Sequence, residues 1–341
     1  MVYIVLYHKK TFLEKNVKNI ISELKKYNLL GRSGSCFPVA LKWESVKNIR
    51  AKEKYIVCNA SEGEPGVFKD GFILKNYPDE VVEGIKIALK TVKNSSAFIY
   101  LKKDYYERFK KRLQKSAKGF PIKIVKKKSV RYIAGEESSV CEAIEGKIPE
   151  PRIKPPFVSQ VGLFSMPTLV NNVETFYWVA KIAKGQYKNH RFYSISGDVK
   201  NKGVFELPEN WTIEKILKET KNFPKFDFFV KVGGGACGEI LLPKELKKPA
   251  SGAGAIIVFN RKKTNLISLM KGWAQFFNNG NCDKCTPCRE GVYRMNEMLK
   301  KGKINKELLE DILFVLEKTS FCSLGKGIPE TFKGVINKLI K

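Results

Sequence analysis

The sequence predicts an α/β protein of several domains: a parallel α/β unit, a small α+β unit and a C-terminal helical bundle. Its 341 residues exceed the usual size of a single hydrophobic core. Strand-like and helix-like patterns alternate in the first third, and helical periodicity dominates after Thr264. We therefore expect domain boundaries at 1–187, 188–262 and 263–341.

The first unit alternates short apolar runs with helical patterns, and this succession indicates a parallel sheet. The strand-like runs are 1–10, Tyr55–Cys58, Ala97–Leu101 and Ile122–Val125, and the helical patterns are 78–92 and 104–116. We expect a further strand end at Tyr132–Gly135, leading into a helix. Residues 144–173 are rich in Pro, Gly and Asn, and an irregular stretch of this length is usually functional.

The second and third units show different patterns. A hairpin, a helix and two strands predict a small α+β unit, for which a β-grasp is one candidate. The hairpin is Phe192–Ser196 with Gly203–Leu207, the helix is Trp211–Glu219, and the strands are Phe228–Val232 and Ala255–Phe259. Four helices then suggest a bundle. They are Leu266–Phe277, one after Cys288, Lys306–Glu317 and Pro329–Ile340.

The net charge of +29 admits two interpretations. A nucleic-acid or anionic lipid surface would use such charge. The lysines are spread along the whole chain, however, without the motif of a nucleic-acid module, which favours a Lys-biased composition or an acidic partner. No apolar run reaches 18 residues and the N-terminus lacks signal-peptide order, so we expect a cytoplasmic protein that meets a membrane only through partners.

Four cysteines in the last fifth of the chain have the spacing of an iron–sulfur site. Cys282, Cys285 and Cys288 form C-x-x-C-x-x-C, and Cys322 follows 34 residues later. Three thiolates at short gaps plus one distant thiolate suit a [4Fe–4S] cluster, whereas zinc more often takes paired C-x-x-C units. A zinc or structural role stays open at this point. Lys284 and Arg289 could offset cluster charge or simply lie at a solvated helix end.

Several loops carry polar groups suited to a nucleotide, and some lie where open α/β sheets bind ligands, at strand ends. Each also has a plainer interpretation as a surface turn, a solvated acidic turn or a helix cap. The loops are Leu30–Pro38, Asn59–Gly66, Tyr132–Ser138, Arg152–Phe157 and Asn171–Thr175. The glycine run Gly233–Gly238 is interpreted as a flexible turn, because no helix clearly follows it.

Taken together, these segments resemble the NADH-binding, FMN-containing flavoprotein subunit of respiratory complex I, in order from about residue 28 to 340. The same module occurs in NAD(P)-linked hydrogenases and formate dehydrogenases. The resemblance implies a Rossmann-like FMN and NADH domain, a ubiquitin-like β-grasp domain and a four-helix bundle with an Fe–S cluster. It implies FMN and [4Fe–4S] as cofactors, and NAD(H) or NADP(H) as substrate.

The resemblance also implies roles for particular residues. The positions that match FMN contacts are Gly31, Arg32, Gly34, Lys42, Asn59, Glu62, Tyr132, Gly135, Glu136, Asn171 and Asn172. Those that match the NADH site are Phe37, Glu64, Glu137, Lys154 and Phe157. The cluster ligands match Cys282, Cys285, Cys288 and Cys322, and the cofactors require no catalytic side chain.

The implied function is hydride transfer from NAD(P)H to FMN, then single-electron transfer to the cluster and to partner Fe–S subunits. Ser33, Cys36 and Ala40 stand where the family usually has glycines, and Ser61 stands where it has Asp. These departures motivate an alternative, an electron-relay subunit that no longer oxidises a nicotinamide nucleotide. We expect the [2Fe–2S] thioredoxin-like ferredoxin to be a separate subunit.

Overall fold

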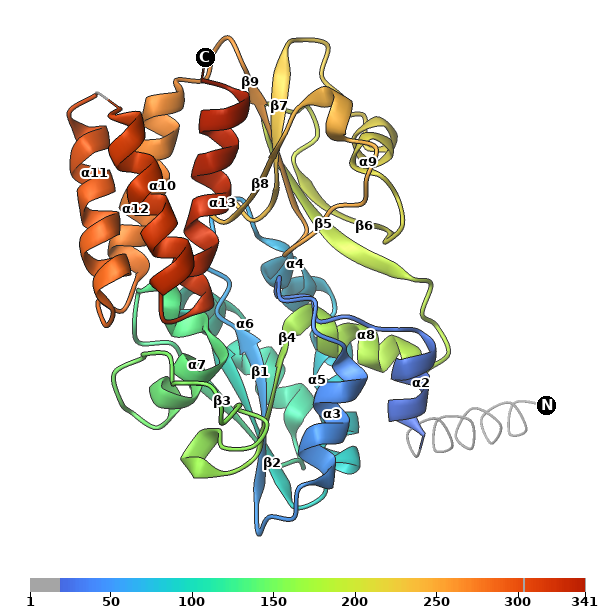
Figure 1. Cartoon of the computed structure of the whole chain (residues 1–341). Helices are drawn as coiled ribbons and strands as arrows, with labels where there is room; N and C mark the ends of the chain where they lie inside the picture. Colours follow the sequence, from blue (N-terminus) through green and yellow to red (C-terminus); the bar gives the residue numbers. More distant parts are fainter. Residues whose placement is uncertain (1–18, 303, 341) are drawn as a thin grey trace.

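The computed structural model describes residues 19–302 and 304–340, so the strand expected at 1–10 lies outside the described residues. Two sheets and a group of long helices make up the described chain (Figure 1). The two sheets lie one above the other in this view, and the helices of the last part stand beside the upper sheet. This is the α/β class that the sequence predicts.

The first sheet is wholly parallel. Its strands are β1 (Lys54–Ala60), β2 (Ser95–Leu101), β3 (Ile122–Lys126) and β4 (Thr168–Asn172), in the order β3-β2-β1-β4. Helices pack on both faces, which is why β1 is a nearly continuous buried run rather than an alternating one. The first three strands are those that the sequence predicts.

The two helices predicted at 78–92 and 104–116, and the one expected after Gly135, are present as α5 (Pro78–Thr91), α6 (Lys103–Ala117) and α7 (Glu137–Ile144). The other helices of this part had no predicted range; they are α2 (Ile20–Lys26), α3 (Val39–Asn48), α4 (Lys69–Asn76) and α8 (Val173–Ala183). Helix α5 has Pro at its first position and acidic residues in its first turn, both favourable there. Its Gly84 lies against the backbone of Phe176, where any Cβ would overlap the carbonyl.

Two predictions for this unit are wrong. Residues 168–172, inside the stretch expected to be irregular, form β4, because they pair with β1 far away in the sequence. The expected strand end at Tyr132–Gly135 is a 3₁₀ turn instead. Both segments border the carboxyl end of β1.

The second sheet is mixed. Its strands are β5 (His190–Gly197), β6 (Gly203–Pro208), β7 (Phe228–Gly233), β8 (Gly238–Leu241) and β9 (Ala255–Asn260), in the order β6-β5-β9-β7-β8. β5 and β9 are parallel neighbours and the other pairs are antiparallel. Helix α9 (Ile213–Glu219) buries its apolar side on this sheet, in the manner of a β-grasp. Strand β8 was not expected from the sequence.

The last part is helical. It consists of α10 (Leu266–Gly280), a short π-helical turn (Pro287–Gly291), α11 (Val292–Lys300), α12 (Lys306–Thr319) and α13 (Ser323–Lys338). Helix α13 begins at Ser323 rather than at the predicted Pro329, which lies inside it. The start prediction failed because Pro is also tolerated within a helix that packing stabilises, at the loss of one backbone bond.

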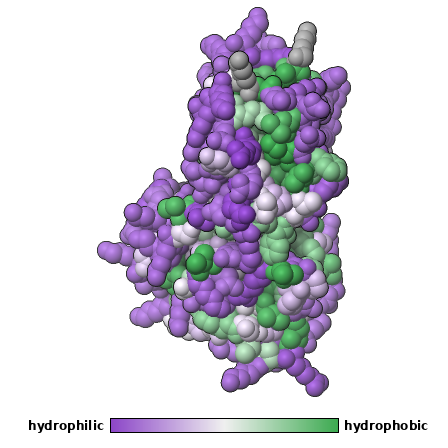
Figure 2. Space-filling model, turned by 60° about the vertical axis from the view of Figure 1, so that its left-hand side comes forward, coloured by the Kyte–Doolittle hydropathy of each residue, from purple (hydrophilic) through white to green (hydrophobic). Residues whose placement is uncertain are grey.

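The surface of the helical part is partly apolar. In Figure 2, hydrophobic side chains lie among polar ones on the upper part of the face shown. Helices α11 and α12 contribute the exposed side chains Tyr293, Leu308, Phe314 and Val315. Within the described ranges, no helix is long and apolar enough to cross a membrane.

Candidate functional site

A cavity of about 990 Å³ lies at the carboxyl end of the parallel sheet. All three parts of the chain line it: the loops after β1 and β4, the second sheet near β7 and β8, and the first half of α13. Its volume is at the upper end of the range for small-molecule sites. Carboxyl ends of parallel strands are where open α/β sheets bind ligands.

The predicted flavin and nucleotide residues line this cavity, with the exception of Gly31. The N–H of Gly31 donates to the Phe37 carbonyl at 2.9 Å, so this glycine closes the loop instead. Gly34 has a φ of +111°, a conformation that favours glycine. Because Gly34 has no side chain, the backbone is open here to a close ligand such as a phosphate.

Arg32 lines the cavity and also takes part in a buried ion pair. Its guanidinium is buried and donates to the carboxylate of Glu209, beyond the end of β6, and to the Tyr187 hydroxyl. This ion pair fixes the glycine loop to the segment that follows β6.

Alternating charges line the wall formed by α3 and α7. Lys42 Nζ lies 3.0 Å from Glu137 Oε2, and Lys154 Nζ lies 2.9 Å from Glu137 Oε1 and 2.8 Å from Glu136 Oε1. Burial would raise the pKa of Glu137, but Lys42 and Lys154 outweigh it and the pKa is lowered. Glu136 also accepts the N–H groups that begin α7. Glu137 is thus held in its ionised form, and both adjacent carboxylates are paired with lysine.

Phe37 and Phe157 present aromatic rings beside these charges. Their side chains are 48% and 53% exposed, and both line the cavity. Large apolar rings that stay this exposed at a pocket are suited to stack on a ligand ring. Lys42 Nζ lies 5.9 Å from the centre of the Phe37 ring.

The loop after β1 is locked to the 3₁₀ turn. Asn59 Nδ2 donates to the Gly135 carbonyl at 2.8 Å, and Asn59 Oδ1 accepts from the Ser61 hydroxyl at 2.6 Å. A Cβ on Gly135 would lie only 2.6 Å from Ser61 Oγ, so the turn needs glycine. Ser61 therefore fits this wall, although it stands where the resemblance leads one to expect Asp.

Glu62 is buried at the start of α4. Its carboxylate accepts the N–H groups of Asp70 and Gly71 at 3.0 and 3.3 Å and the Tyr105 hydroxyl at 2.5 Å. Burial, and then the charge of Asp70, raise the pKa of Glu62 to about 7. The side chain is thus a helix cap that titrates near neutrality at the edge of the cavity.

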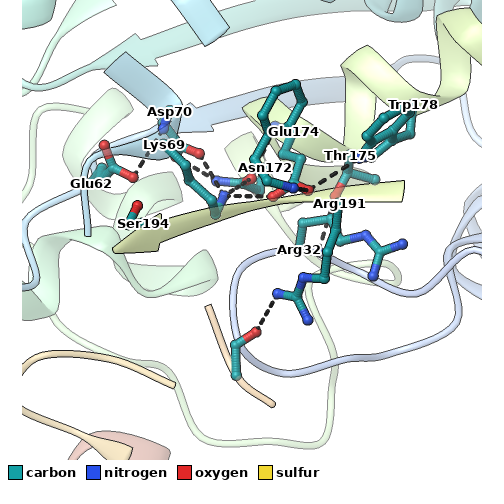
Figure 3. A network of polar contacts seen from close by, with 12 residues as sticks. Arg32, Glu62, Lys69, Asp70, Asn172, Glu174, Thr175, Trp178, Arg191 and Ser194 are labelled. Atoms are coloured by element: carbon teal, nitrogen blue, oxygen red, sulfur yellow. Dashed lines mark hydrogen bonds and ion pairs between the residues drawn. The ribbon is translucent and has the colours of Figure 1, made fainter. Parts of the chain in front are cut away.

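Beneath the cavity lies a buried ionic cluster that sequence reasoning missed. Lys69 Nζ lies 2.7 Å from Asp70 Oδ1, 3.1 Å from Glu174 Oε2 and 3.1 Å from Asn172 Oδ1, as Figure 3 shows. Lys69 and Asp70 are consecutive charges at a helix start, which sequence alone places in solvent. They become buried because α8 packs over them, a contact that no local pattern reveals.

The two predicted asparagines end β4 and have structural partners. Asn171 Oδ1 accepts the Trp43 indole N–H at 2.9 Å. Asn172 caps α8 by accepting the Glu174 N–H at 3.0 Å, and its Nδ2 donates to Asp70 Oδ2 at 2.6 Å. The alternatives of amide contact and helix cap therefore both describe Asn172.

The glycine run 233–238 is a fixed part of the wall, so the prediction of a flexible turn is wrong. The N–H groups of Ala236 and Cys237 donate to Glu64 Oε1 at 3.1 and 2.7 Å, and the Tyr132 hydroxyl donates to Glu64 Oε2 at 3.1 Å. A Cβ on Gly234 or Gly235 would overlap the Glu64 carboxylate or the Pro65 carbonyl. Burial raises the pKa of Glu64 although these donors oppose the shift.

The four clustered cysteines meet at the base of the helical part, around the buried Cys288. Burial and then the three neighbouring thiols raise the pKa of Cys288. Burial also raises the pKa of Cys322, while backbone N–H groups of Gly325 and Leu324 act against the shift by donating to its sulfur. These donors, from the first turn of α13, would stabilise a thiolate.

The spacing of the four cysteines favours a cluster, because a [4Fe–4S] cluster binds each thiolate through a different iron. Among the described residues, no three His, Cys, Asp or Glu side chains are grouped to hold one metal ion. Lys284 is paired with Glu150 at 2.8 Å and Arg289 with Glu290 at 3.1 Å, both at exposed positions beside the cysteines.

The cavity and the cysteines adjoin. Ser323 and Leu324, the residues directly after Cys322, line the inner end of the cavity. The nucleotide-sized pocket thus extends to the residues that directly follow one of the four cysteines.

Comparisons with known proteins agree with this site. Residues 24–181 match the Nuo51 FMN-binding domain, and residues 268–339 match the NADH-ubiquinone oxidoreductase-F iron-sulfur binding region. The second F-type NADH-quinone oxidoreductase subunit of Rhizobium meliloti is 29% identical, over 94% of this chain and 86% of the relative. The F-type NADH-quinone oxidoreductase subunit of Buchnera aphidicola is 31% identical, over 97% and 84%.

A solved structure of an NAD⁺-reducing [NiFe]-hydrogenase in the H₂-reduced state has the same fold. It superimposes with a TM-score of 0.87 at 26% identity over 95% of this chain. This chain spans 62% of the length of that hydrogenase chain.

Fold, site and matches together define a flavin- and iron–sulfur-type electron-transfer oxidoreductase subunit. Within that class, the chain belongs to the family of F-type NADH-quinone oxidoreductase subunits.

Proposed function

We propose that this chain is the electron-input subunit of a larger redox complex, where it oxidises NADH with bound FMN and delivers electrons to a [4Fe–4S] cluster. The observation that carries the proposal is the continuity of the site, from the exposed Phe37 and Phe157 to the residues beside Cys322. FMN, when bound, accepts a hydride and releases electrons one at a time. The protein contributes position and charge.

We assign FMN to the part of the cavity between the glycine loop and the carboxyl ends of β1 and β4. Lys42 supplies the cation of this part, and the backbone at Gly34 allows close approach of a phosphate. The residues proposed to hold FMN are Arg32 and Gly31 through the loop they shape, and Gly34, Lys42, Asn59, Glu62, Tyr132, Gly135, Glu136, Asn171 and Asn172.

We assign the nicotinamide nucleotide to the more exposed part. Phe37 and Phe157 offer faces for ring stacking, and the carboxylate of Glu137 could accept ribose hydroxyls. Lys154 keeps that carboxylate ionised, and Glu64 fixes the opposite wall. NADH is favoured over NADPH because a 2′-phosphate would meet Glu136 and Glu137.

Cys282, Cys285, Cys288 and Cys322 are the proposed cluster ligands. All eight cysteines of the chain lie in described residues and none forms a disulfide, as expected of a protein in the reducing cytoplasm. We further propose that a separate [2Fe–2S] thioredoxin-like subunit and other Fe–S subunits accept the electrons. The exposed apolar side chains of α11 and α12 are a surface that such subunits could cover.

The test is anaerobic reconstitution of the chain, followed by assay of flavin, iron and nucleotide reactivity. We expect one FMN and about four irons per chain, because the fourth thiolate completes a cubane. NADH should bleach the flavin absorbance, and NADPH should do so at least tenfold more slowly. Failure to bind FMN would contradict the proposal.

The electron-relay alternative rests on Cys36, which lines the cavity with a φ of +50° at a position where the family usually has glycine. It predicts bound FMN and cluster with no bleaching by either nucleotide. The substitution Cys36→Gly would relieve the backbone strain at this positive φ and would remove the cysteine side chain from the cavity. Bleaching that appears only in C36G would favour the relay.

A further inference from the structure

Ser320 is a buried polar residue near the cluster cysteines, and its hydroxyl forms no hydrogen bond in the described chain. It follows α12, and its side chain is 4% exposed. Its backbone N–H is satisfied by the Leu316 carbonyl at 3.2 Å. The Oγ atom, by contrast, has no hydrogen-bond partner among the described residues. Buried hydroxyls normally have one, so this atom needs an explanation.

The surroundings of the hydroxyl point to the cluster. A Cβ placed on Gly325 would overlap Ser320 Oγ and would lie 3.9 Å from the Cβ of Cys288. Ser320 therefore lies directly against Gly325, whose own N–H donates to the sulfur of Cys322. The hydroxyl thus adjoins Gly325, which itself lies next to two proposed ligands, Cys288 and Cys322.

No other partner is available for it among the residues that the structure describes. The neighbouring hydroxyl of Thr319 is exposed and donates to the Val315 carbonyl at 2.7 Å. Ser320 Oγ is buried instead, next to Gly325, whose N–H already donates to sulfur. A hydroxyl is a donor whose hydrogen rotates to meet an acceptor, and sulfur of a thiolate or cluster is such an acceptor.

We propose that the Ser320 hydroxyl donates a hydrogen bond to the sulfur of the bound [4Fe–4S] cluster or its ligands and thereby raises the reduction potential. The reason is electrostatic: the reduced cluster carries one more negative charge, so a fixed donor stabilises it more than the oxidised form. Ser320 is a positioning and tuning residue and not a ligand. The inference rests on the proposed cluster site.

The experiment is an EPR-monitored redox titration of the reconstituted full chain. S320A should make cluster reduction up to tenfold less favourable, which is a shift of up to about 59 mV to lower potential for one electron. T319A is the matched control, because its hydroxyl is engaged elsewhere, and it should titrate like the wild type. S320T retains a donor and should also stay near the wild type.

If S320A does not take up a cluster, S320T and S320V are compared instead. Their side chains have nearly the same shape, but only that of threonine carries a hydroxyl. The valine variant should then titrate at the lower potential. Equal potentials in S320A and the wild type, or in S320T and S320V, would overturn the inference while leaving the proposed function intact. A wild-type chain without a cluster signal would overturn the proposed function itself.

Discussion

The flavin wall and the cluster region of this molecule are built in different ways. The cluster region takes three of its four cysteines from the short segment 282–288 and the fourth from the residue just before α13. The flavin wall brings together loops from both sheets and holds them with buried ion pairs such as Lys69–Glu174. The cluster region can be recognised from the spacing of cysteines in the sequence, whereas the flavin wall forms only through packing between remote segments.

The difference teaches what each region should tolerate. A cluster ligand has no substitute, because each thiolate binds its own iron. A wall held by many mutually dependent contacts should instead lose stability and affinity by degrees. Substitutions in the two regions should therefore separate cluster loss from flavin loss.

The largest expected effect is loss of the cluster with retention of FMN. Cys322→Ala should remove nearly all [4Fe–4S] absorbance and EPR signal after reconstitution, while FMN content stays near one per chain. Cys141→Ala is the control, since Cys141 is buried elsewhere and should keep both cofactors. Parallel loss of FMN in C322A would show that the two regions are not separable.

The next effect tests the ionic cluster beneath the flavin wall. Lys69→Met leaves Asp70 and Glu174 buried without their cation, and breaking such a pair typically costs about 3–5 kcal/mol of unfolding free energy. Urea denaturation measures it. Lys218→Met, in the exposed pair with Glu214, should change nothing measurable. Equal stability of the two variants would mean that the buried cluster does not hold the wall.

The glycine run tests the wall at a single contact. Gly235→Ala would push the run away from Pro65 and should weaken NADH binding at least tenfold, about 1.4 kcal/mol, with the cluster retained. NADH titration of flavin bleaching measures it. In α10, Gly272 has no atom near a built Cβ, so G272A should bind NADH normally. Normal affinity in G235A would restore the flexible-turn interpretation.

The smallest effect is a pH dependence from Glu62. Its pKa of about 7 lies above the usual value, so the folded state binds the proton more tightly than the unfolded state. The contribution of Glu62 to the free energy of unfolding is therefore greatest below about pH 4 to 5, and it is lost as the pH rises toward 7. Glu62→Gln should remove about 1–2 kcal/mol of that fall between pH 5 and 8. Identical pH profiles in urea denaturation would contradict the assignment.

Much of the fold was predictable, and the failures have physical causes. Strand β1 was found because it is a short apolar run, helix α5 because its apolar residues follow the helical period, and the cysteines because of their spacing. β4 was missed because Thr168–Asn172 is half polar and pairs only with a distant strand. The ion pairs of Lys69 and Arg32 were not foreseen, because their partners, Glu174 and Glu209, come from remote elements.

The most direct test of the central claim is an anaerobic NADH titration of the reconstituted wild-type chain, followed by flavin absorbance and by EPR of the cluster. One continuous site predicts that NADH bleaches the flavin and that the reduced [4Fe–4S] signal appears in the same chain without any partner subunit. The contradicting result is a flavin that NADH bleaches beside a cluster that NADH leaves oxidised. This result counts only if a stronger chemical reductant does reduce the cluster and shows that its reduction potential lies above that of NADH.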